Sequence, residues 1–257
     1  MWPFKKKSKP KKTRTVTATT VICIPGLWKD KDEIKNTIVS SSNGEYMAVG
    51  EILLSVKRER HYKIEIRGRD ERMKESFKYL GRTTRITDEC LNKIESHNFV
   101  IYISGETGGL KEAENIAFAG TAVLKAGGIA IKIETTGKAF EKNKWLNLID
   151  NFEEPDLYQM FVVDSITDKN GSVWTCGMHN LGLRDTIISG EEFQTSVDVL
   201  SIFGYYQIFD KPILLHDQTF QADPQSLKYR ITDEPDQPNK DNELFRNPYG
   251  MWRLARI

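Results

Sequence analysis

Residues 98–135, NFVIYISGETGGLKEAENIAFAGTAVLKAGGIAIKIET, carry the clearest structural pattern in the chain. Segment 99–104 is a continuous apolar run of the kind found in buried strands, and 128–135 is a second one. Between them, small and apolar residues recur at the spacing of one helix face, which lets a helix lie close against a sheet. These residues are Ala113, Ile116, Ala117, Gly120 and Leu124. We therefore predict a strand, a turn, a helix that ends at Gly127 and Gly128, and a second strand.

More strands and helices are predicted on both sides of this unit, from β-branched runs, alternating apolar residues and helix-start signals such as Thr87 and either Asp30 or Asp32. Strands are predicted at 15–24, 46–56 and 61–70, and helices at 29–40, 71–81, 87–97 and 144–150. These elements predict an α/β sandwich with a mixed sheet over residues 15–150.

The acidic, proline-containing segment EEPD (153–156) marks a predicted boundary, after which a second unit covers residues 151–257. Strands are predicted at 157–166, 172–180, 212–221 and 227–234, with a long helix at 191–210 and a docked final segment at 245–257. We expect a smaller antiparallel sheet with one long helix across it. The fold class predicted for the whole chain is therefore α+β in two parts, preceded by a basic flexible arm at 1–14.

The composition favours a soluble cytoplasmic protein. Of the 257 residues, 39% are hydrophobic and 28% charged, and no apolar run approaches the roughly 20 residues of a membrane-spanning helix. The basic start lacks the apolar stretch of a secretory signal. Three widely spaced cysteines, Cys23, Cys90 and Cys176, indicate reduced thiols.

The net charge of +1 hides a basic N-terminus and an acidic body. Residues 1–14 contain seven basic side chains and no acid, so the rest of the chain carries −6. The basic residues are Lys5, Lys6, Lys7, Lys9, Lys11, Lys12 and Arg14. A solvated chain end is the expected role, and contact with nucleic acid or an anionic membrane is the alternative.

The segment CGMHNLGLRD (176–185) raises the question of a nucleophile site, because a histidine follows a cysteine by three residues. In a strand, Cys176 and His179 point to opposite faces with α-carbons about 10 Å apart, beyond hydrogen-bond reach. We therefore predict that Cys176 is a core residue. His179, Arg184 and Asp185 remain candidates for a catalytic or ligand-binding group.

The turn GETGG offers a second candidate site. Backbone N–H groups of Gly105, Gly108 and Gly109 at a helix start could bind an anion. The turn lacks the spacing and lysine of known phosphate loops, and Glu106 would repel a phosphate, so turn geometry is the favoured interpretation. The four histidines show no metal-ligand spacing, and we predict no metal and no cofactor.

An acidic stretch near the C-terminus is the candidate for partner binding. It spans 233–243, contains one lysine, and its acids are Asp233, Glu234, Asp236, Asp241 and Glu243. An exposed acidic loop can steer a basic protein partner, and a solvated loop is the alternative.

The C-terminal half, through CGMHNLGLRD, LLHDQTFQ and NPYGMWRL, resembles a group of uncharacterised bacterial proteins that carry a domain of unknown function. The resemblance covers residues from about 150 onward and implies no catalytic residues. Some families of similar size are immunity proteins of bacterial toxin systems, which is an analogy only. Our hypothesis is a non-enzymatic protein-binding module, such as an immunity or accessory factor that neutralises or escorts a protein partner. The alternative is an enzyme or small-ligand binder that uses the 179–185 bend or the GETGG turn.

Overall fold

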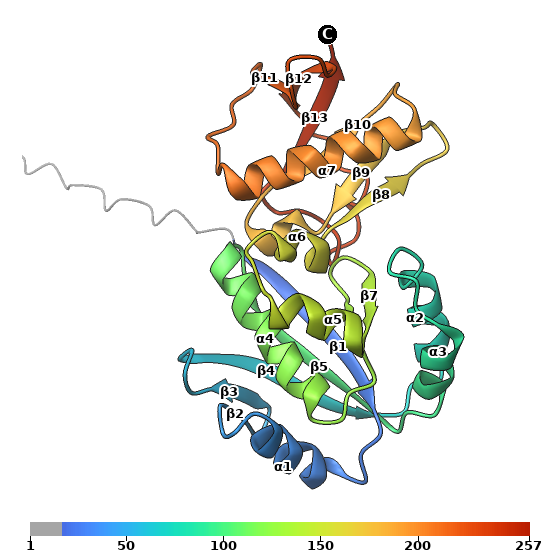
Figure 1. Cartoon of the computed structure of the whole chain (residues 1–257), viewed down its shortest axis with the longest axis vertical. Helices are drawn as coiled ribbons and strands as arrows, with labels where there is room; N and C mark the ends of the chain where they lie inside the picture. Colours follow the sequence, from blue (N-terminus) through green and yellow to red (C-terminus); the bar gives the residue numbers. More distant parts are fainter. Residues whose placement is uncertain (1–16) are drawn as a thin grey trace, which may run out of the picture.

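The chain is built around two β-sheets, seen one above the other in Figure 1. The structure is a computed structural model that describes residues 17–257. The predicted basic arm, Lys5 to Arg14, lies outside the described residues. The predicted α+β class is confirmed, whereas the strand directions within the two sheets differ from the prediction.

The first sheet has the strand order β2-β3-β4-β5-β1-β6-β7, and every neighbouring pair is antiparallel. Its strands are β1 (Ala18–Gly26), β2 (Tyr46–Val49), β3 (Ile52–Ser55), β4 (Arg60–Gly68), β5 (Phe99–Thr107), β6 (Ala130–Ile133) and β7 (Lys138–Glu141). The predicted mixed sheet is therefore wrong. The strand-helix-strand unit at 98–135 does form, but β1 lies between its two strands and runs opposite to both.

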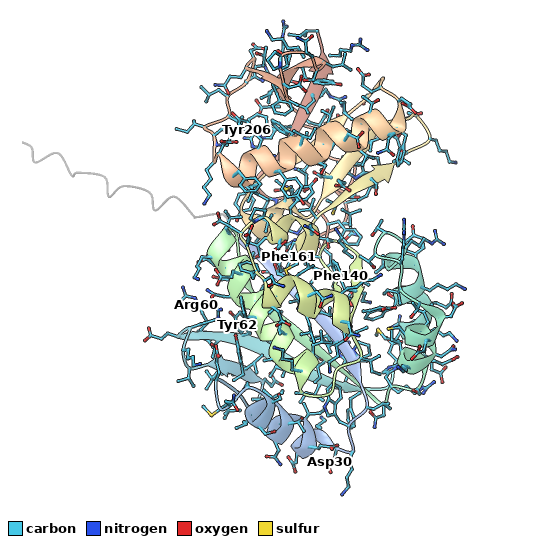
Figure 2. The ribbon with its side chains drawn as sticks, in the orientation of Figure 1. Asp30, Arg60, Tyr62, Phe140, Phe161 and Tyr206 are labelled. Carbon is cyan, nitrogen blue, oxygen red and sulfur yellow. The ribbon has the colours of Figure 1, made fainter. Side chains whose placement is uncertain are left out.

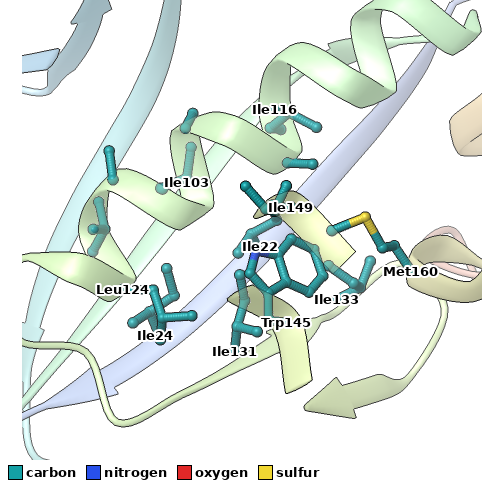
Figure 3. Packing of buried hydrophobic residues seen from close by; sticks show 14 of the residues in the cluster. Ile22, Ile24, Ile103, Ile116, Leu124, Ile131, Ile133, Trp145, Ile149 and Met160 are labelled. Carbon is teal, nitrogen blue, oxygen red and sulfur yellow. The ribbon is translucent and has the colours of Figure 1, made fainter. Parts of the chain in front are cut away.

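Five helices cover the two faces of this sheet. They are α1 (Lys31–Ser41), α2 (Met73–Leu80), α3 (Asp88–Glu95), α4 (Leu110–Lys125) and α5 (Lys142–Asp150). As predicted, Asp30 and Thr87 cap α1 and α3 by accepting hydrogen bonds from first-turn N–H groups. Ile22 packs in the cluster with α4, whereas its neighbour Cys23 packs on the opposite face with α2 and α3. Figure 3 shows α4 over the first of these faces.

The second sheet has the order β11-β12-β13-β10-β9-β8. Its strands are β8 (Val163–Thr167), β9 (Val173–Cys176), β10 (Asp185–Ile188), β11 (Thr219–Gln221), β12 (Lys228–Asp233) and β13 (Met251–Arg256). The predicted antiparallel sheet is wrong in one pair, because β13 enters between β12 and β10 and runs parallel to β10. The docked final segment is thus an inner strand of the sheet.

The helices of the second half are α6 (Asp156–Phe161), the short 3-10 helix η1 (Met178–Leu181) and α7 (Phe193–Phe209). The predicted long helix is α7, which crosses the second sheet (Figure 1). Three predicted strands are shorter than expected: 157–166 starts as α6, 172–180 ends at Cys176 and is followed by η1, and 212–221 pairs only through β11. The single strand predicted at 46–56 is a hairpin formed by β2 and β3.

The largest buried cluster extends across the predicted boundary at residue 150. It contains Trp145 and most isoleucines of the first sheet, and from the second half Leu157, Phe161 and Met178. The rings of Trp145 and Phe161 meet edge to face, with centroids 6.4 Å apart. Apolar side chains from both halves therefore pack in one buried cluster.

Candidate functional site

The bend at 176–185 links β9 to β10 through η1. Gly177 enters the bend with φ +120°, and Gly182 leaves η1 in the left-handed conformation with φ +76°. Cys176 is buried, and this burial raises the pKa of its thiol well above the usual value. A thiol that resists ionisation is a poor nucleophile, which agrees with the core role predicted for Cys176.

His179 and Asp185 approach each other without a hydrogen bond, because His179 Nδ1 lies 4.0 Å from Asp185 Oδ2. The Asp185 carboxylate is already engaged: it accepts from Thr175 Oγ1 and the Met178 backbone N–H, both at 3.1 Å, and from Asn247 Nδ2 at 2.8 Å. Asp185 therefore holds the bend in place. His179 is 2% exposed, and neither ring nitrogen has a hydrogen-bond partner among the described residues.

Asn180, the neighbour of His179, connects the bend to the first sheet. Its Oδ1 accepts from Thr20 Oγ1 at 2.5 Å and from Thr135 Oγ1 at 3.0 Å, and its Nδ2 donates to the Gly177 carbonyl at 2.9 Å. Asn180 is fully buried. The bend thus serves as a polar connection between the two halves.

Arg184 lies apart from this connection. Its guanidinium stacks over the Trp252 ring, 4.0 Å from the centroid, and donates to Asp233 Oδ1 at 2.6 Å. Arg184 lines a cavity that neither His179 nor Asp185 lines. The three candidate residues are therefore not assembled around one shared cavity.

Three of the five acids in the 233–243 segment form ion pairs or hydrogen bonds with other side chains of the chain. Asp233 holds Arg184 and His216, and the Arg184 hydrogen bond lowers the pKa of its carboxyl. Glu234 is buried and bonded to Arg253, and Asp236 pairs with Lys240 at 3.2 Å. Asp241 and Glu243 are exposed, and neither has an ion pair among residues 17–257. The segment is thus less free to recruit a basic partner than its composition indicates.

The glycines of GETGG serve close packing. A Cβ at Gly105 would lie 2.7 Å from the Tyr62 ring, and one at Gly108, where φ is +121°, would lie 2.1 Å from Tyr249 Oη. Gly109 is the N-cap of α4 and supplies no side-chain cap. The turn therefore brings α4 close to the C-terminal segment, and the predicted anion site remains a prediction.

The surface that the sequence interpretation missed is the outer face of α7. The helix has 17 residues and one charged side chain, Asp198. Its inner face packs Leu200 and Phe203 on the second sheet, while Ile202 and Phe209 are exposed. We define the α7 apolar surface as this exposed end and the segment after it: Ile202, Tyr205, Tyr206, Phe209, Ile213 and Leu215. Figure 2 labels Tyr206 on this helix.

An acidic group of side chains borders this surface. The Tyr205 ring stacks on Tyr158 of α6 with centroids 4.6 Å apart, and Lys211 pairs with Glu154 at 2.8 Å. Burial raises the pKa of Tyr205, and the nearby Asp164 and Asp156 carboxylates raise it further. We define the acidic border as Glu154, Asp156, Asp164 and Asp210.

Comparisons with known proteins assign no family. No protein-family model matches the chain, and neither a curated protein nor a solved structure is significantly similar to it. Within residues 17–257 there is no cluster of three or more side chains suited to a metal ion. No helix in that range is both long and apolar enough to cross a bilayer.

Proposed function

We propose that the protein is a non-enzymatic binding module and that the α7 apolar surface contacts its protein partner. The observation that supports this proposal is the distribution of apolar residues on α7. A helix that is apolar on all sides is normally buried on all sides, yet α7 leaves Ile202 and Phe209 exposed, the latter at 64%. Exposed apolar residues that cluster mark interaction sites far more often than single ones do.

The residue types in and around the α7 apolar surface indicate what kind of partner surface it would bind. Tyr and Phe are enriched at protein interfaces, and burying each large apolar side chain contributes about 1.5–3 kcal/mol. Ile202 and Phe209 are seven residues apart and so lie on the same helix face, a spacing used when a helix packs into a groove. The acidic border favours a partner whose apolar groove has a basic rim. An immunity or accessory factor works through such a contact, since it neutralises or escorts its partner without chemistry.

The test compares two phenylalanines at opposite ends of α7. Phe209 lies in the proposed surface, whereas Phe193 is also exposed, at 47%, but lies at the other end of the helix. The partner would be captured with the wild-type protein from native extract, purified and re-bound. We expect Phe209→Asp to weaken binding of the purified partner at least tenfold, and Phe193→Asp to change it little.

Neutralising the acidic border tests the charge contribution. Asp210→Asn should slow association at low salt and have less effect at high salt, because Asp210 is exposed and exposed charges are screened. Equal affinity of the two phenylalanine variants for the purified partner would refute the proposed surface. If the partner dissociates only when Asp241 and Glu243 are substituted, the binding site is the C-terminal acidic segment and not the α7 apolar surface.

A further inference from the structure

A cavity of about 500 Å³ opens beside the last turn of α7 and the segment that follows it. Its walls come from four elements distant in sequence: the first residue of α4, the residues after η1, the end of α7, and β13. In Figure 1, the N-terminal end of α4 is the end nearer the second sheet. The volume lies within the range of about 300–1,000 Å³ typical of small-molecule sites.

One side-chain amide in the cavity wall, that of Gln207, has an N–H donor without a hydrogen-bond acceptor among the described residues. Gln207 lines the cavity, is 3% exposed, and its Nε2 has no acceptor among the described residues. Leaving a buried amide donor without an acceptor costs about 1–3 kcal/mol. The two ends of an amide exchange by rotation about χ3, so this donor can turn toward an oxygen atom in the cavity. A ligand acceptor would remove the cost.

The rest of the wall is apolar and positively charged. Leu110, Leu183 and Leu214 supply apolar surface, with the Trp252 ring. Arg184 and Lys211 are the two charged residues of the lining, which contains no carboxylate. Both cations are held in position from outside it, Arg184 by Asp233 and Lys211 by Glu154.

We propose that this cavity binds a small apolar molecule that carries one carboxylate. The carboxylate accepts from Gln207 and from Arg184 or Lys211, and the apolar body lies against the leucines and Trp252. Arginine and an amide are both N–H donors to carboxylate oxygen, and the contact with a guanidinium is charge-assisted. The cavity adjoins the proposed protein-binding surface, since Lys211 pairs with Glu154 of the acidic border. The two can be tested separately, because Gln207 is on the buried side of α7 and Phe209 is on the exposed side.

The experiment is a calorimetric titration of the full chain with two acids, naphthylacetate and decanoate, and with their uncharged analogues naphthylethanol and decanol. We expect at least one acid to bind with a 1:1 stoichiometry and its alcohol to bind at least tenfold more weakly. Gln207→Leu should weaken binding of that acid at least tenfold. Gln194→Leu is the matched control, because Gln194 is an exposed glutamine on the same helix, outside the cavity.

Lys211→Gln provides a second variant, since Lys211 is exposed and its replacement leaves the core unchanged. It should also weaken binding of the acid. Thermal unfolding of each variant without ligand separates loss of the site from loss of the fold. Failure of both acids to bind at millimolar concentration would overturn the proposal. So would equal binding of acid and alcohol, or unchanged binding by a folded Gln207→Leu variant.

Discussion

Replacing Asn180 by alanine tests whether the polar connection at the bend stabilises the whole molecule. The substitution removes three side-chain hydrogen bonds, to Thr20, Thr135 and the Gly177 carbonyl. At about 1 kcal/mol net for each bond, their loss costs about 3 kcal/mol. Thr20 keeps a second bond, to Thr107, but the Thr135 hydroxyl loses its acceptor in a buried site, which adds about 1 kcal/mol.

The expected loss is therefore about 4 kcal/mol in the free energy of unfolding, which for a chain of this size lowers the melting temperature by roughly 8–16 °C. Urea unfolding followed by tryptophan fluorescence and far-UV circular dichroism measures it. The two probes should show one coincident transition in the wild type, because the apolar cluster and Asn180 connect both halves. Asn147→Ala, at an exposed position of α5, is the control and should change stability by less than about 0.5 kcal/mol.

A double-mutant cycle sharpens the test. Thr135→Val alone should cost about 1 kcal/mol, whereas in the Asn180→Ala background it should regain about 1 kcal/mol, because it removes the unpaired hydroxyl. A loss below about 1 kcal/mol for Asn180→Ala, or strict additivity with Thr135→Val, would refute the reasoning. Either result would mean that the bend contributes little to the connection between the sheets.

Three further outcomes follow from the same structure. Gly177→Ala places a Cβ 2.0 Å from a backbone oxygen at φ +120°, so urea unfolding should show a far larger loss than for Gly171→Ala, where φ is also positive but the space is open. Burial lowers the pKa of Lys138 to about 8 from its ordinary 10.5, so between these values the unfolded chain binds more protons and stability rises with pH. Lys138→Met should lack that rise in unfolding measured from pH 7 to 10; an identical rise in the variant would contradict the assignment. A thiol reagent should modify half-buried Cys90 first and the buried Cys176 only on unfolding, and equal rates would show that the core opens readily.

Local pattern was sufficient for the elements whose apolar residues follow one clear period. The strand-helix-strand unit at 98–135, the capped starts of α1 and α3, and the long helix α7 could all be predicted. The first part of segment 157–166 could not, because a short apolar run fits a buried helix as well as a buried strand, whereas residues 163–166 belong to β8 as predicted. In the structure Leu157, Tyr158, Met160 and Phe161 are all buried, and this run forms α6.

The sequence by itself therefore determined the α+β class and most elements, since periodicity and capping act between residues close in the chain. Only the tertiary structure decided strand directions, because the insertion of β1 between β5 and β6, and of β13 beside β10, depends on contacts between distant segments. The same holds for the candidate sites. Arg184 and Asp185 are neighbours in the chain, yet Arg184 reaches Asp233 at the surface while Asp185 is buried, because consecutive residues of an extended backbone point to opposite faces. The exposed face of α7 and the cavity beside Gln207 arise from packing among α4, α7 and β13, so the order of residues alone does not reveal them.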